Sequence, residues 1–268
     1  MANNKLRLDS VLVLGAGKIG STVADMLAAH DPHDRLPVTL ADQWHGAQQQ
    51  EHDASVRRIT LDATRSDDLS AALAAHCAVI NCLPFYLAQP VAALAARCGT
   101  HYFDLTEDVA ATQAIRRMAG NASAVLMPQC GLAPGVIGML GWQLASRFDQ
   151  LYDLRLRVGA LTRHSTNSLR YNFTWSIDGV INEYCNPAEA IVNGERVMVQ
   201  PLEGHETFTL DAEAFEAFNT SGGLGTLCES LQGQVRNLDY KSIRYPGHRE
   251  AMNFLLHDLR LIERRDLL

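Results

Sequence analysis

The chain has 268 residues, of which 47% are hydrophobic and 20% are charged, and its formal net charge is −7. This length is sufficient for two domains, and the composition is typical of a globular protein with a sizeable core. The negative charge and the absence of a basic block argue against nucleic acid and anionic membranes as partners.

Neither the start of the chain nor its cysteines indicate export or metal binding. The first seven residues contain no apolar segment of the kind found in a signal peptide. The six cysteines form no CxxC pair and no Cys/His cluster with zinc spacing. We therefore predict a cytoplasmic protein with reduced thiols, no metal and no membrane segment.

The first strong pattern is a run of branched apolar residues that breaks into three glycines and continues at helical spacing. It predicts a buried strand, a turn and a helix. Gly15 permits the tight turn, Gly17 lets backbone approach phosphate oxygens, and Gly20 lets helix and strand pack closely. We predict a dinucleotide site here that includes Lys18 and Ile19, with a structural glycine turn as the alternative.

A second strand, predicted at residues 38–41, ends in Asp42, 22 residues after Gly20. An acidic side chain at this point can accept hydrogen bonds from the adenosine ribose. It would repel a 2′-phosphate, and Gln43 and Trp44 supply no positive charge to neutralise one. The sequence therefore predicts NAD rather than NADP as the cofactor.

Strand and helix patterns alternate from there to residue 127. Four more strands are predicted, at residues 58–62, 78–83, 101–105 and 125–127. Six strands alternating with helices predict a doubly wound parallel (Rossmann) sheet, and we assign residues 1–133 to this α/β domain. Strand ends should line the cofactor, with Asp62 near the adenine and Asn81, Leu83 and Pro84 beside the nicotinamide ribose. A turn-forming role is an equally weighted alternative for Asp62.

The pattern changes after Pro134, and residues 134–268 are expected to form a second α+β domain for substrate binding and dimerisation. Helices are predicted near residues 135–148 and 173–184. Strands are predicted near residues 151–161, 206–210 and 235–243, together with a β-hairpin on the turn Asn193–Gly194. These elements predict a mixed sheet.

Two stretches of this second half are suited to holding a substrate carboxylate. A glycine-rich segment is expected to open a helix, where the N–H groups of Ser221, Gly222 and Gly223 could bind an anion. An ordinary glycine turn is the alternative. Arg244 could form a bidentate pair with a carboxylate, with His248 beside it in the same turn, and a surface arginine is the alternative.

Together these stretches resemble the saccharopine dehydrogenase-like family, and within it the bacterial lysine 6-dehydrogenases. The resemblance is carried by residues 11–20, 79–92, 101–108, 128–141, 175–187, 218–233 and 243–248. It implies an NAD(P)-dependent oxidoreductase that acts on a C–N bond and forms a homodimer or homotetramer. In the lysine branch, hydride passes from the ε-carbon of L-lysine to NAD, and the imine hydrolyses to allysine, which cyclises to piperideine-6-carboxylate.

The resemblance leaves two alternatives. One is a reductase of saccharopine or carboxynorspermidine type, which would act on a secondary amine with two arms. The other follows from the length of the chain, because family members continue past the point where this chain stops. A truncated or naturally short form is therefore expected, and an inactive NAD-binding homologue is the alternative from another functional class.

Oxidation of an amine requires a neutral nitrogen and produces a cation, so the site needs a proton acceptor and a carboxylate near that nitrogen. Asp104 and Glu107 follow the fifth predicted strand, at the edge where open α/β sheets bind ligands. We predict that they are catalytic, with a loop carboxylate and a helix-capping glutamate as the structural alternatives. Cys130 has no histidine beside it in sequence and is expected to pack in the core.

Overall fold

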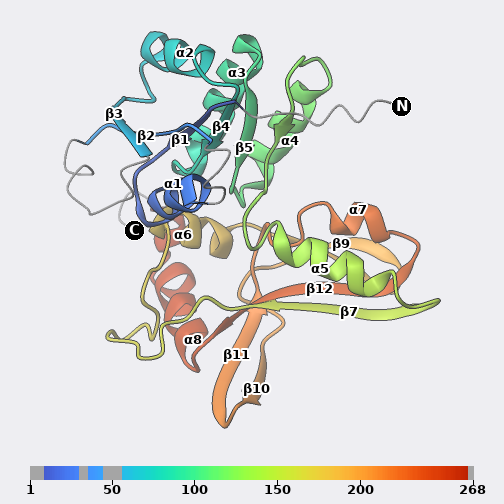
Figure 1. Cartoon of the computed structure of the whole chain (residues 1–268). Coiled ribbons are helices and arrows are strands. Elements are labelled where there is room, and N and C mark those ends of the chain that lie inside the picture. Colours follow the sequence, from blue (N-terminus) through green and yellow to red (C-terminus); the bar gives the residue numbers. More distant parts are fainter. Residues whose placement is uncertain (1–8, 30–35, 45–55, 265–268) are drawn as a thin grey trace. The chain divides into compact units, whose positions relative to one another are not determined.

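The computed structural model describes residues 9–29, 36–44 and 56–264. The chain forms two compact units (Figure 1). The first contains residues 1–106 and 110–130, and the second contains residues 107–109 and 131–268. No helix in the described ranges is long and apolar enough to cross a membrane.

A parallel sheet of six strands organises the first unit, in the order β3-β2-β1-β4-β5-β6. Its strands are β1 (Val11–Leu14), β2 (Val38–Asp42), β3 (Val56–Thr60), β4 (Ala78–Asn81), β5 (His101–Asp104) and β6 (Leu126–Met127). The strand order reverses between β1 and β4, which is the point where doubly wound sheets bind ligands. The predicted fold of this half is confirmed.

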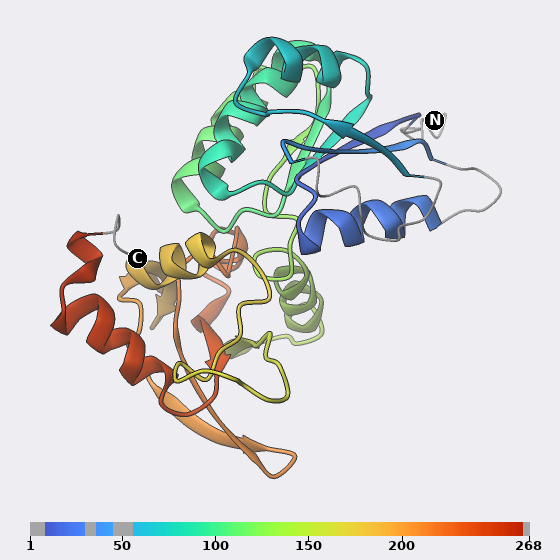
Figure 2. The same ribbon diagram turned by 90° about the vertical axis from the view of Figure 1, so that its left-hand side faces the viewer.

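Helices cover both faces of this sheet (Figure 2). They are α1 (Lys18–Ala29), α2 (Ser66–Ala74), α3 (Ala88–Cys98) and α4 (Val109–Ala119), with a short 3₁₀ turn η2 (Phe85–Leu87) before α3. Successive β1 side chains point to opposite faces. Val11 and Val13 pack in the cluster that contains α1, whereas Leu12 and Leu14 pack against α2, α3 and α4. This arrangement buries both faces of β1 and fixes the glycine turn that follows it.

The second unit contains a sheet in the order β10-β11-β12-β8-β9, and β7 pairs in parallel with β12. Its strands are β7 (Leu151–Val158), β8 (Ala188–Val192), β9 (Glu195–Val199), β10 (Glu206–Leu210), β11 (Glu213–Asn219) and β12 (Val235–Arg244). The other pairs are antiparallel, so the predicted mixed sheet is confirmed. The predicted hairpin is also confirmed, because Asn193 and Gly194 both have positive φ and join β8 to β9. Strand β11 was not predicted.

The helices of the second unit fall into two packing groups. They are α5 (Val136–Ala145), α6 (Ile177–Cys185), α7 (Leu227–Leu231) and α8 (His248–Asn253), followed by η3 (Phe254–Asp258) and η4 (Leu261–Glu263). Helices α5 and α7 share one core cluster with β7 and β12. Helices α6 and α8 share another with Tyr171 and Phe218. The prediction that α6 starts near residue 173 is wrong, because the Ser176 hydroxyl caps the helix by accepting a hydrogen bond from the backbone N–H of Gly179.

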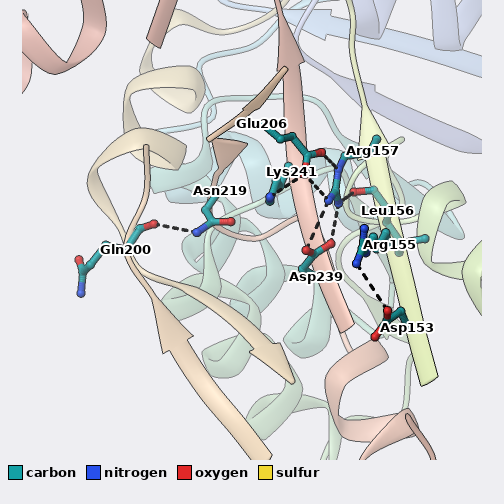
Figure 3. A network of polar contacts seen from close by, with 9 residues as sticks. All are labelled: Asp153, Arg155, Leu156, Arg157, Gln200, Glu206, Asn219, Asp239 and Lys241. Atoms are coloured by element: carbon teal, nitrogen blue, oxygen red, sulfur yellow. Dashed lines mark hydrogen bonds and ion pairs between the residues drawn. The ribbon is translucent and has the colours of Figure 1, made fainter. Parts of the chain in front are cut away.

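Charged side chains link β7, β10 and β12 (Figure 3). Arg157 forms ion pairs with Glu206 and with Asp239, and the Arg157–Asp239 distance is 2.6 Å. Lys241 Nζ also donates to Glu206, at 2.8 Å. This ion-pair network joins strands that are up to 82 residues apart in sequence.

Candidate functional site

The glycine turn of the first unit has the geometry of a phosphate cradle. Gly15 has φ of +94°, and a Cβ on it would lie 3.0 Å from the carbonyl oxygen of Cys82. A Cβ on Gly20 would lie only 1.8 Å from the carbonyl oxygen of Gly15. Both glycines are therefore required by the fold itself.

Gly17 differs from the other two, because a Cβ added to it would meet no atom within 4 Å. Gly17, Lys18 and Ile19 are exposed at the point where α1 begins. Open space beside exposed backbone at a helix start is what a pyrophosphate requires. These residues therefore fit a dinucleotide.

Asp42 lies at the carboxyl end of β2, and its carboxylate is tied to the glycine turn. Oδ2 accepts a hydrogen bond of 2.7 Å from the backbone N–H of Ala16, and Oδ1 accepts one of 3.0 Å from that of Trp44. Each carboxylate oxygen can accept a further hydrogen bond, so the group is still able to bind ribose hydroxyls. The contact between Asp42 and the turn was not predicted from the sequence.

The segment after β4 lies against the same turn. The backbone N–H of Cys82 donates to the carbonyl of Leu14 at 2.9 Å, and a Cβ on Gly15 would lie 3.3 Å from the Leu83 side chain. Asn81 is buried, where it donates to the hydroxyl of Tyr102 and accepts from the backbone N–H of Leu83. Its side chain shapes the segment, and Leu83 and Pro84 remain half-buried next to it.

Asp62 adopts the turn role that was its alternative interpretation. Its Oδ1 accepts from the backbone N–H of Thr64 at 2.9 Å and from the Thr64 hydroxyl at 2.7 Å. These hydrogen bonds lower the pKa of the Asp62 carboxyl. Leu61 bonds to the carbonyl of Asp42, so Asp62 still lies near the end of β2, and its adenine contact remains a prediction.

Asp104 ends β5 and is 1% exposed. Its Oδ2 accepts from the hydroxyl of Tyr102 at 2.7 Å, and Oδ1 accepts from the backbone N–H groups of Thr106 and Gln129, each at 3.0 Å. Burial raises the pKa of this carboxyl even though the three hydrogen bonds oppose the shift. Asp104 therefore fixes the backbone after β5 to the backbone after β6. Its catalytic partner in the prediction, Glu107, belongs to the second unit.

Cys130 follows β6 and is exposed, so the expectation that it packs in the core is wrong. Its backbone N–H donates to the carbonyl of Asp104 at 2.7 Å, which ties the segment after β6 to the end of β5. Partial desolvation of the sulfur, and then the charge of Asp104, raise the pKa of the thiol even though the residue as a whole is exposed. A raised thiol pKa disfavours the thiolate, so Cys130 is a poor nucleophile here.

In the second unit, Arg244 ends β12 and is 4% exposed, which excludes the surface-arginine alternative. Its Nε donates to the hydroxyl of Tyr184 at 2.8 Å, and its guanidinium carbon lies 4.4 Å from the ring centroid of Tyr171. Burial alone would lower its pKa, but Tyr184, Tyr171 and Glu183 raise it. The result is a permanently charged, rigidly held guanidinium of the type that binds carboxylates.

His248 supports this arrangement. It is 0% exposed, its Nδ1 lies 2.7 Å from the carbonyl oxygen of Leu169, and its Nε2 lies 3.0 Å from the hydroxyl oxygen of Tyr184. Burial lowers its pKa to about 4, so the ring is neutral. A carbonyl only accepts, so Nδ1 carries the proton and Nε2 accepts from Tyr184. The predicted substrate contact of His248 is therefore wrong, because both nitrogens are engaged and the ring positions Tyr184 instead.

Glu183 on α6 is a buried carboxyl group that was not predicted from the sequence as a site residue. It is 5% exposed, and burial raises its pKa to about 8, with Arg244 lowering the pKa and Glu107 raising it. The helical spacing that predicted Val180 and Tyr184 as buried also places Glu183 next to that face, which is the signal that could have identified it.

The glycine-rich segment does not begin a helix as predicted. Helix α7 starts only at Leu227 and has five residues. The backbone N–H of Ser221 donates to the carbonyl of Glu183 at 3.0 Å and is therefore not available to an anion. A Cβ on Gly222 would lie 2.2 Å from the Glu107 carbonyl oxygen, and one on Gly223 would lie 2.2 Å from the Tyr240 ring. The glycines serve close packing and bring residues 107 and 183 together.

Two family models match the chain. The saccharopine dehydrogenase NADP binding domain matches residues 11–127, and the saccharopine dehydrogenase C-terminal domain matches residues 131–266. The described stretches that correspond to these matches contain the glycine turn and the buried Arg244, respectively.

Curated relatives are considerably longer than this chain. The mitochondrial alpha-aminoadipic semialdehyde synthase of Rattus norvegicus is 25% identical over 260 residues, which cover 91% of this chain and 27% of the rat protein. The NADP(+), L-glutamate-forming saccharopine dehydrogenase of Saccharomyces cerevisiae is 27% identical over 193 residues, which cover 69% of this chain and 43% of the yeast protein. The chain thus spans less than half the length of these relatives.

A solved structure shares the fold. Apo saccharopine dehydrogenase (L-Glu forming) from Saccharomyces cerevisiae aligns with a TM-score of 0.73 and 24% identity, covering 95% of this chain and 59% of the yeast chain. The two family models cover both units from residue 11 to residue 266 apart from a three-residue gap. This chain therefore belongs to the saccharopine dehydrogenase family.

Proposed function

We propose that this chain is an NAD-dependent oxidoreductase that acts on a C–N bond of an amino acid, with the ε-amine of L-lysine as its substrate. The observation that carries the proposal is the buried Arg244, which Tyr184 and Tyr171 hold in one orientation. A buried, fixed guanidinium is suited to the carboxylate of an amino acid. Family membership and the dinucleotide cradle of the first unit supply the redox half of the proposal.

The preference for NAD rests on Asp42. When NAD is bound, its nicotinamide ring would supply the hydride acceptor for oxidation of the amine. The Asp42 carboxylate keeps its capacity to accept ribose hydroxyls while it bonds to Ala16 and Trp44. A 2′-phosphate would face this negative charge, so NADP is disfavoured.

Proton transfer is assigned to the two carboxyl groups predicted from the sequence. Asp104 is nearly sealed from solvent and has a raised pKa, so it is able to retain a proton at a pH where an exposed aspartate has lost it. Glu107 is buried in the second unit. We expect Asp104→Asn and Glu107→Gln each to lower kcat about 100-fold, since general acid–base catalysis contributes about 10² to 10⁴. Wild-type turnover in both variants would remove the assignment.

The experiment that tests the proposal is NADH formation at alkaline pH, where a larger fraction of the amine is neutral. The substrates are L-lysine, saccharopine, L-ornithine and L-glutamate, each with NAD and with NADP. We expect turnover with L-lysine and NAD, and loss of that turnover in Arg244→Met. Tight NAD binding without turnover of any amine would instead identify an inactive homologue.

A second candidate is a saccharopine-type reductase. It is favoured by the NADP binding domain model that matches residues 11–127 and by the yeast relative, a saccharopine dehydrogenase named for NADP(+). Such an enzyme would use a secondary amine and NADP. Turnover with saccharopine and NADP, and none with L-lysine, would select this candidate.

A further inference from the structure

A carboxyl group and a guanidinium are buried in the second unit without forming an ion pair. Glu183 is 5% exposed and Arg244 is 4% exposed. The charge of Arg244 acts on Glu183, yet among the described residues the Glu183 carboxyl forms neither a hydrogen bond nor an ion pair within 4.0 Å. Burial of both groups would cost less free energy if they formed a direct ion pair.

The surrounding elements hold both groups in place. Arg244 is held by Tyr184 and stacks on Tyr171. The backbone of Glu183 is fixed by the Ser221 N–H, which donates to its carbonyl at 3.0 Å. The Nδ2 of the neighbouring Asn182 donates to Oδ2 of Asp108 at 3.2 Å rather than to the Glu183 carboxyl.

A buried carboxyl without a hydrogen-bond partner is costly for a protein to maintain. The titratable and charged groups that act on Glu183 or feel its charge are Arg244, Glu107, Tyr184 and Tyr240. Glu107, Tyr184 and Tyr240 carry no positive charge that would stabilise a Glu183 carboxylate. Arg244 is positively charged but lies beyond ion-pair distance. A ligand that carries both an anionic and a cationic group would satisfy Glu183 and Arg244 at once.

We infer that Glu183 binds the ammonium group of an amino acid whose carboxylate binds Arg244, so that the site selects zwitterions over simple carboxylates. The inference rests on the proposed function, because it takes Arg244 as the carboxylate site. It adds a residue that sets specificity and gives the substrate class as α-amino acids with a free amino group.

Calorimetric titration of the full chain at pH 7 tests the inference with two probes of equal chain length. L-norleucine carries the carboxylate and the ammonium but no ε-amine to oxidise, whereas hexanoate carries only the carboxylate. We expect L-norleucine to bind about 10- to 100-fold more tightly, the value of one charge-assisted hydrogen bond. Glu183→Gln should remove this discrimination and leave hexanoate binding unchanged.

Glu195→Gln is the matched control, because Glu195 is an exposed glutamate of the same unit, and it should bind both probes as the wild type does. Equal affinity of the wild type for both probes would overturn the inference. An equal weakening of both probes in Glu183→Gln, with the thermal unfolding temperature retained, would also overturn it.

Proton release gives a second measurement. Burial holds the pKa of Glu183 at about 8, so the carboxyl is mostly protonated at pH 7. An ammonium group against it favours the carboxylate, and the proton leaves to the buffer. Titration in buffers of different ionisation enthalpy should therefore show proton release on L-norleucine binding in the wild type and in Glu195→Gln, and none in Glu183→Gln. Absence of release in the wild type would count against Glu183 as the ammonium ligand.

The amine panel separates this inference from the proposed function. If L-norleucine binds more tightly than hexanoate and no amine is oxidised, the inference holds and the proposed reaction fails. If L-lysine is oxidised and hexanoate binds as well as L-norleucine, the reaction holds and the inference fails.

Discussion

The Nε of Arg244 donates a hydrogen bond to the hydroxyl oxygen of Tyr184, and that hydroxyl in turn donates to Nε2 of His248. The direction is fixed because Nδ1 of His248 must donate to the carbonyl of Leu169. In this series of hydrogen bonds, His248 positions the Tyr184 hydroxyl, and that hydroxyl orients the guanidinium of Arg244. Tyr184 thus joins two residues distant in sequence, Arg244 at 60 positions and His248 at 64 positions.

Tyr184→Phe tests this relationship. The ring volume is kept, while the guanidinium of Arg244 loses its anchor and His248 loses its donor. We expect the KM for the amino-acid substrate to rise about 10-fold with a smaller change in kcat, because one hydrogen bond to a charged group contributes about 1.5–3 kcal/mol. Steady-state kinetics at saturating NAD measure both values.

Tyr152→Phe is the control for that variant, because Tyr152 is 60% exposed and bonds only to the side chain of Gln150 among the described residues. Its kinetics should match the wild type. An unchanged KM in Tyr184→Phe would mean that Tyr171 and the backbone of residue 243 suffice to orient Arg244.

Substitution by alanine should have opposite effects at two glycines of the turn, weakening NAD binding at Gly17 and lowering stability at Gly20. Gly17→Ala meets no atom within 4 Å, so the thermal unfolding temperature should be retained while the methyl group occupies the space for the pyrophosphate and weakens NAD binding. Gly20→Ala places Cβ 1.8 Å from the Gly15 carbonyl, so the turn must shift and stability should fall by more than about 2 kcal/mol. Calorimetric NAD binding and thermal unfolding distinguish the two. NAD affinity unchanged in Gly17→Ala would remove the cradle interpretation.

Asp42→Asn tests the choice of cofactor. The amide keeps an oxygen for the Ala16 N–H but loses the negative charge that opposes a 2′-phosphate. We expect the ratio of kcat/KM for NADP to that for NAD to rise at least about 10-fold, equivalent to about 1.4 kcal/mol. Asp67→Asn, in the first turn of α2, serves as a charge-matched control that should leave the ratio unchanged. A wild-type enzyme that already prefers NADP would contradict the prediction.

The fold of the first unit was predictable because local patterns and tertiary structure agree. The strand ending at Leu14, the glycines and the strand ending at Asp42 each carry their information within a few residues. Strand β11 was not predictable in the same way. Its sequence EAFEAFN is rich in Glu and Ala, which favour helix, and pairing with β10 and β12 imposes the extended form.

Roles in the candidate site could be predicted only where the type of a single residue suggests them. Arg244 was proposed from the sequence as a carboxylate ligand and is buried and held as that role requires, although the role stays a prediction. The roles of its neighbours depend on contacts between distant segments. His248 became a positioning residue because Leu169 and Tyr184 engage both of its nitrogens. Glu183 was missed because a charged residue in an amphipathic helix is usually solvated, whereas here it is 5% exposed and its backbone bonds to the glycine-rich segment.

Glu206 gives the second unit a defined dependence on pH. Burial alone would raise its pKa, but hydrogen bonds from Arg157 and Lys241 lower it from 4.5 to about 2. A carboxyl whose pKa is lower in the folded state stabilises the protein above the pKa of the unfolded chain. The stabilisation is lost as the pH falls from about 4.5 toward about 2.

We therefore expect Glu206→Gln to lower the free energy of unfolding at pH 7 by about 1–2 kcal/mol, a value reduced for the one-third exposure of the Glu206 side chain. The difference from the wild type should shrink progressively below pH 4.5. Urea unfolding between pH 3 and 7 measures it, and Glu213→Gln, an exposed glutamate of β11, should show no such difference. Other groups that titrate at low pH are shared by all three proteins and cancel from the comparison. A wild-type advantage that stays constant from pH 7 to pH 3 would mean that Glu206 contributes through packing rather than through its charge.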